Sequence, residues 1–217
     1  MTEVWRPKEV DETPSGDSWL GFQKASIIGV LDLSEEKSKE LDFADVYLEC
    51  EVAIEGSEYT RFVTISGGLV RGADGTLEHN NTIKKVYDFM DVIGCKAGLD
   101  MKGNWVEQDG TPIPDMGAYL SANHTQTASE AKPDVYVFVY NKPAKAGATM
   151  KDGKPRKYYT NCYGKFWPLN AKGLKDGESF VKWMRSKGYL KEYVEGANGH
   201  TEVQEALGGQ DTSAMNL

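Results

Sequence analysis

"DVYLECEVAIEGSEYTRFVTIS", residues 45–66, holds the clearest secondary-structure signal in the sequence. Apolar and polar residues alternate through its first half, so alternate side chains fall on one face of a strand. The "EGSE" at 55–58 predicts a turn, and residues 59–66 predict a returning strand. The stretch therefore predicts a β-hairpin whose first strand buries one face, made of Val46, Leu48, Cys50, Val52 and Ile54.

The segments on either side extend this hairpin. Residues 19–33, "WLGFQKASIIGVLDL", predict a bent strand in which Gly21 and Gly29 permit coiling or a bulge. After the hairpin, residues 82–94 carry apolar residues at helical spacing. Asn81 or Thr82 is expected to cap this helix, and Gly94 is expected to end it. The first half therefore predicts three strands followed by a helix.

The second half predicts two more strands. Residues 98–131 predict an irregular insert with a short hairpin around "NWVEQDGTPI". Residues 135–140 and 157–167 predict strands separated by a basic loop, and a last helix is expected to begin near Asp176. Five strands with a helix between the third and fourth is the element order of an OB-fold barrel. We therefore expect a mainly β fold, a five-stranded OB-type barrel with accessory helices.

The expected domain spans residues 19–195. Residues 1–18, rich in proline and acids, predict a flexible lead-in, and residues 196–217 predict a flexible, mildly acidic tail. The N-terminus has no apolar segment typical of a secretion signal, and no apolar run predicts a membrane span. Three cysteines far apart in sequence favour reduced thiols. These features predict a cytoplasmic protein. No CxxC or HxxxH spacing indicates a metal site, and we expect neither a bound metal nor a cofactor.

Charge is distributed very unevenly along the chain. The whole sequence carries a net charge of -8, yet residues 132–191 hold 14 Lys and Arg against 4 Asp and Glu, a net of +10. Residues 1–131 hold 11 against 24, a net of -13. Such asymmetry is typical of a polyanion-binding site on a body of opposite charge.

Aromatic residues flank the basic loop. Within residues 135–140, Val135, Val137 and Val139 share one face and suit a barrel interior. The opposite face, and one face of the partner strand, carry the rings that we expect to stack on unpaired bases: Tyr136, Phe138, Tyr140, Tyr159 and Tyr163. Trp167 is a weaker candidate, because Pro168 follows it.

The loop itself supplies the cations that we expect to bind phosphates: Lys142, Lys145, Lys151, Lys154, Arg156 and Lys157. A loop between the last two barrel strands lies on the oligonucleotide-binding side of OB-folds. Two ordinary readings compete with this one. The rings could be covered by the terminal helix, with Phe180 and Trp183, and a lysine-rich loop could simply be solvated.

With its three early strands, mid-chain helix and aromatic final hairpin, the chain resembles, over roughly residues 19–170, the single-stranded DNA-binding proteins that phages encode for replication and recombination. The resemblance implies an OB-fold that coats unwound DNA without sequence preference, in the host cytoplasm and without enzymatic activity. Such proteins often recruit replication or recombination proteins through a strongly acidic tail. Here the last residues hold only Glu202, Glu205 and Asp211, which puts that recruitment in doubt.

Two other classes of function stay open. Pro133-Asp134 followed by Asp152-Gly153-Lys154 matches the PD-(D/E)xK pattern, in which carboxylates hold Mg²⁺ and a lysine steadies the attacking water of a nuclease. Alternatively, rows of rings also stack on sugars, and a basic loop could dock an acidic protein. A purely structural phage protein is a further possibility.

Overall fold

The computed structural model of the chain describes residues 20–41, 44–78 and 82–193. The predicted lead-in and tail, and Asn81, lie outside the described residues. Nothing in the described ranges forms a helix with the length and apolarity needed to cross a membrane. The elements are β1 (Gly21–Asp32), α1 (Ser34–Lys37), β2 (Val46–Ile54), β3 (Thr60–Gly67), β4 (Val70–Arg71), β5 (Leu77–Glu78), α2 (Lys84–Val92), β6 (Gly98–Leu99), β7 (Trp105–Val106), α3 (Met116–His124), β8 (Val135–Pro143), β9 (Tyr158–Pro168) and α4 (Ala171–Ser186).

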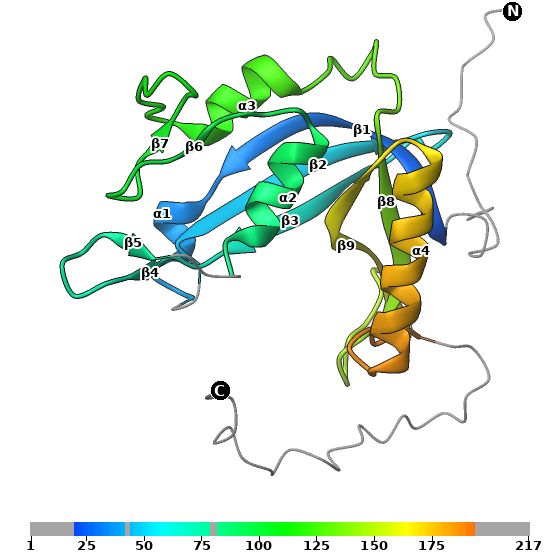
Figure 1. Ribbon diagram of the computed structural model, residues 1–217. Coiled ribbons are helices and arrows are strands. Elements are labelled where there is room, and N and C mark those ends of the chain that lie inside the picture. The colour runs from blue at the N-terminus through cyan, green and yellow to red at the C-terminus, as the bar shows by residue number, and fades with distance from the viewer. Residues whose placement is uncertain (1–19, 42–43, 79–81, 194–217) are drawn as a thin grey trace, which may run out of the picture.

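The five long strands form one antiparallel sheet in the order β3-β2-β1-β8-β9 (Figure 1). This sheet curls until its two outer strands meet. A Cβ atom on Gly164 of β9 would lie only 2.5 Å from the carbonyl oxygen of Thr64 in β3, so the close approach requires a residue without a side chain. The result is a nearly closed, OB-like barrel, and the predicted fold class is confirmed.

The inward faces of the strands build the core. All five apolar residues predicted to share a face of β2 are buried, and so are Val135, Val137 and Val139 of β8. The pairing of β1 with β2 shifts between Ile27 and Gly29, which is the bulge that Gly29 indicated. The three cysteines are free thiols and are buried. The barrel-facing positions predicted on β2 and β8 are therefore confirmed.

Helix α2 lies across the sheet beside β3 and β9. It buries Val86, Phe89 and Met90, and the Phe89 ring centroid lies 5.2 Å from that of Phe166 in β9. Thr82 does not cap this helix, as it was expected to do, because its hydroxyl donates instead to the carbonyl oxygen of Gly68 at 2.7 Å. Gly94, with a φ of 71°, follows the helix end as predicted.

The insert at 98–131 contains more regular structure than the sequence indicated. Strands β6 and β7 pair as a small hairpin, and a single bridge joins Val106 to Pro112. Helix α3 follows, and its start is fixed by Asp115, whose carboxylate accepts a hydrogen bond from the backbone N–H of Ala118 at 2.8 Å. The prediction of an irregular segment was therefore wrong for residues 116–124.

Helix α3 covers the part of β1 that β8 does not pair with (Figure 1). The Ser121 hydroxyl donates to the Val30 carbonyl at 2.9 Å and accepts from the Val30 N–H at 3.0 Å. A Cβ on Gly117 would lie 2.5 Å from the backbone nitrogen of Asp32, so the helix and the strand are in close contact. The insert therefore completes the barrel wall at this edge.

The approach of β9 to β3 can be tested by replacing Gly164→Ala. The added methyl group must push the two strands apart, and we expect unfolding free energy to fall by about 1–3 kcal/mol. Urea denaturation measures this change. Gly98→Ala is the matched control, because nothing lies within 4 Å of a Cβ built there, and it should stay within about 0.5 kcal/mol. Equal stability of the two variants would contradict the proposed closure.

Candidate nucleic-acid interface

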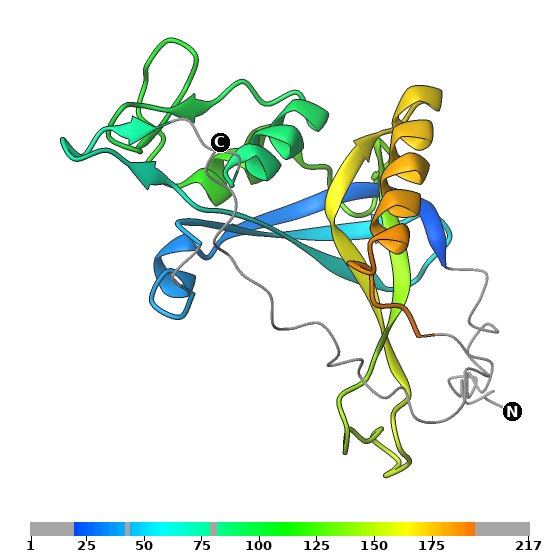
Figure 2. The same ribbon diagram turned by 60° about the horizontal axis from the view of Figure 1, so that its bottom comes forward.

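Helix α4 packs against the outer face of β9 and covers the outward side chain of Phe138 in β8 (Figures 1 and 2). It begins at Ala171 rather than near Asp176, because the side chain of Asn170 caps it by accepting from the Gly173 N–H at 2.8 Å. A Cβ on Gly177 would lie 2.6 Å from the Phe22 ring, and one on Gly173 would lie 2.1 Å from the Pro168 carbonyl oxygen. These glycines let the helix approach the strands closely.

A second apolar cluster lies between α4 and the barrel. Phe138 and Trp167 are 3% and 4% exposed, and the Phe22 ring lies 5.2 Å and 5.1 Å from them. Val181, Met184 and Leu190 complete the buried part of this cluster. Phe138 does face away from the barrel interior, as the alternation predicted. The prediction that it stacks on bases is wrong, because α4 covers the ring, and the same holds for Trp167.

Tyr136, Tyr140 and Tyr163 are half-buried at the border of the same cluster. The Tyr163 ring lies 5.6 Å from Phe180 of α4, and its hydroxyl donates to the Met184 sulfur at 3.9 Å. Burial raises the pKa of both Tyr140 and Tyr163, so these phenols stay neutral over the physiological range. The tyrosines hold the helix in place, and they do not form the exposed row that was expected.

Tyr159 is the predicted stacking residue that remains accessible, with 44% of its surface exposed. It lies on β9 beyond the reach of α4, opposite Lys142 in the strand pairing. The guanidinium carbon of Arg156 lies 4.7 Å from the centre of its ring, a cation–π contact that steadies both side chains. One predicted ring and one predicted cation are thus joined.

Beyond the barrel, β8 and β9 continue into a projecting hairpin, residues 142–159, which we call the basic arm (Figure 2). Backbone hydrogen bonds hold it together: the N–H of Ala144 donates to Lys157, that of Arg156 to Ala148 and that of Met150 to Lys154, at 3.0, 2.8 and 2.7 Å. The loop expected from the sequence is therefore largely a hydrogen-bonded hairpin that presents its side chains to solvent.

All six predicted phosphate-binding cations belong to this arm. Five are exposed, and Arg156 is half-buried over Tyr159. Asp152 is the sole acid within residues 142–159, and its carboxylate lies 3.0 Å from the Lys154 ammonium group. Hydrogen bonds from Lys154 lower the pKa of Asp152. The structure thus gathers the predicted cations on one projection, with one local acid against six positive charges.

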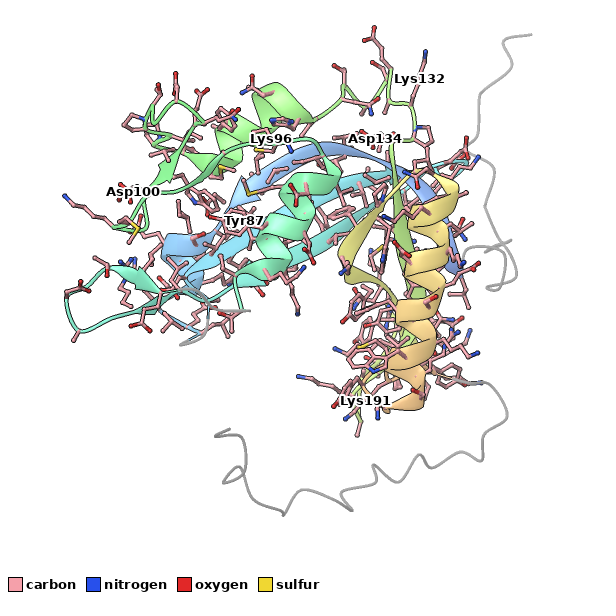
Figure 3. All side chains as sticks on the ribbon, in the orientation of Figure 1. Tyr87, Lys96, Asp100, Lys132, Asp134 and Lys191 are labelled. Carbon is pink, nitrogen blue, oxygen red and sulfur yellow. The ribbon has the colours of Figure 1, made fainter. Side chains whose placement is uncertain are left out.

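The residues of the nuclease pattern are not brought together. Asp134 precedes β8 at the end remote from the arm, where it accepts from the Gln126 amide at 2.8 Å (Figure 3). Asp152 lies at the tip of the arm. The nine residues of β8 separate it from Asp134, which is roughly 30 Å at the usual rise per residue. One Mg²⁺ cannot contact both carboxylates. The described residues contain no cluster of three or more His, Cys, Asp or Glu suited to a metal ion.

Two exposed rings at the end of α4 were missed as site residues. Trp183 and Tyr189 are 48% and 64% exposed. Met184 is buried in the apolar cluster, whereas the neighbouring Trp183 lies at its border, with its ring centroid 5.9 Å from that of Phe180. The composition signal was present, because Trp183 sits among Lys182, Arg185 and Lys187.

Comparison with protein-family models, curated proteins and solved structures gave no match to this chain.

The buried ring of Phe138 and the exposed ring of Tyr159 should contribute differently to stability. Phe138→Ala removes a buried ring, and we expect it to lower the unfolding free energy by about 3–5 kcal/mol. Tyr159→Ala removes an exposed ring and should cost less than about 1 kcal/mol. Urea denaturation of both variants measures the contrast. Similar losses would show that α4 does not seal Phe138.

Proposed function

We propose that this protein binds single-stranded DNA without strong sequence preference and without catalysis. The observation that carries the proposal is the basic arm: six cations and one acid on a hydrogen-bonded hairpin that joins the last two strands of an OB-like barrel. In this role the protein would protect unwound strands during replication or recombination, in the cytoplasm of a phage-infected host cell.

The charges favour a polyanion at the arm. Cations on one short hairpin repel one another at distances near the screening length of ~8 Å at physiological salt. A phosphate backbone relieves that repulsion and releases its own counterions, which favours binding most strongly at low salt. Residues 1–131 carry a net charge of -13, which opposes binding of a polyanion to that part of the chain.

Exposure of Tyr159 favours an unpaired strand over a duplex. A base that is free of its partner can stack on this ring, worth about 1–3 kcal/mol, while Arg156 remains beside it for a phosphate. The outer face of β2 and β3 is less suitable. Glu49 and Glu51 of β2 lie there opposite Thr64 and Phe62 of β3, and carboxylates repel phosphates. The DNA strand therefore follows the basic arm rather than the outer face of β2 and β3.

The proposal is tested by titrating the protein with labelled oligo(dT) over a series of salt concentrations. In the variant Lys145→Gln with Lys151→Gln, the dependence of log K on log salt should become shallower by roughly 1.4. The matched control replaces two exposed lysines outside the arm, Lys85→Gln with Lys102→Gln, and it should keep the slope of the unmodified protein.

Four outcomes would count against this function. An unchanged salt slope in the arm variant would place the phosphates elsewhere, and tighter binding to duplex would contradict single-strand preference. Progressive cleavage of the oligonucleotide with Mg²⁺ would favour the nuclease. Binding to a neutral oligosaccharide, insensitive to salt, would favour a sugar-binding module.

A further inference from the structure

The end of α4 presents a pair of aromatic side chains to solvent. The Trp183 and Tyr189 ring centroids lie 5.6 Å apart, with an angle of 68° between the ring planes. Single exposed apolar side chains are ordinary on a protein surface, but here two exposed rings are in contact and form one patch. The pair therefore requires an explanation beyond packing, since the buried side of the helix is already filled by Val181 and Met184.

The backbone fixes the position of this pair. Gly188, with a φ of 68°, ends the helix in a Schellman motif: the Tyr189 N–H donates to the Met184 carbonyl and the Gly188 N–H to the Arg185 carbonyl, both at 3.0 Å. Leu190, the next residue, is buried in the cluster beneath α4. Tyr189 is thus anchored on both sides, and the ring pair is preorganised for a planar ligand.

Trp183 is continuous with the outer face of β9. Its ring lies 5.9 Å from Phe180, which lies 5.6 Å from Tyr163 of β9. Tyr159 follows on the same face of that strand, roughly 13 Å further along at the usual rise per residue. A path of rings therefore leads from the arm to the end of α4, with its two ends exposed and its middle half-buried.

Cations accompany the ring pair. Lys172 and Lys187 lie on the same helical stripe as Trp183, eleven residues before it and four after it, with Asp176 as the acid between them. Both lysines are exposed. Lys191 lies beyond the helix end, next to the arm (Figure 3). Arg185 contributes less, because Glu192 accepts two hydrogen bonds from its guanidinium group.

We propose that Trp183 and Tyr189 form a second base-stacking site, so that one unpaired strand runs from Tyr159 on the basic arm along β9 to the end of α4. This inference rests on the proposed function and extends it to a part of the chain that no motif indicated. The pair takes unpaired nucleobases, and Lys187 and Lys191 take the neighbouring phosphates.

The test is a titration with oligo(dT) in which each variant is compared with the unmodified protein. The variant Trp183→Ala should bind about tenfold more weakly, because it loses one stacked base. Tyr59→Ala is the matched control: Tyr59 is 66% exposed but lies at the β2–β3 turn beside Glu58, and its loss should leave affinity unchanged.

A second variant separates stacking from folding. Trp183→Phe keeps a ring and should retain affinity within about threefold, yet it should lose a large part of the fluorescence quenching caused by oligo(dT). If Trp183→Ala binds as tightly as the unmodified protein, the second site is wrong while the arm proposal stands. If the unmodified protein binds no oligo(dT), both proposals fail together.

Discussion

Strands β9 and β3, the two outer strands of the sheet, come into backbone contact and close the barrel. Gly164 allows the β9 backbone to lie against Thr64, and this contact turns a five-stranded sheet into a nearly closed barrel. Because β9 is held there, Cys162 and Phe166 point into the core, whereas Tyr163 and Trp167 point outward. The position of α4 and the direction of the arm both follow from this alternation.

The aromatic residues on the outward face of β9 fall into two groups, one buried and one exposed. Near the barrel its outward rings pack beneath α4, where Trp167 contributes to stability and is inaccessible. Past the end of the helix the same face is uncovered at Tyr159, where Arg156 sits over the ring. The role of an outward side chain on β9 therefore depends on whether α4 covers it.

The barrel could be predicted from sequence because its signals are local. Alternation of apolar and polar residues along 46–54 predicted which side chains of β2 are buried, and the alternating valines predicted the same for β8. Alternation cannot tell whether an outward face meets water or a helix, which is why Phe138 was misassigned. Helix α4 was predicted to start too late because Gly173 and Gly177, required for close packing, resemble loop residues. Helix α3 has buried residues at Met116, Gly117 and Leu120, with no clear apolar stripe to indicate it.

The Ser121 hydroxyl, which bonds both backbone groups of Val30, bears on how copies of this chain behave at high local density. An open strand edge is a template on which a neighbouring molecule can extend the sheet. Copies crowded together at high concentration would bring such edges within reach of one another. With this edge of β1 already satisfied from within, neighbours can crowd together there without fusing into fibrous aggregates.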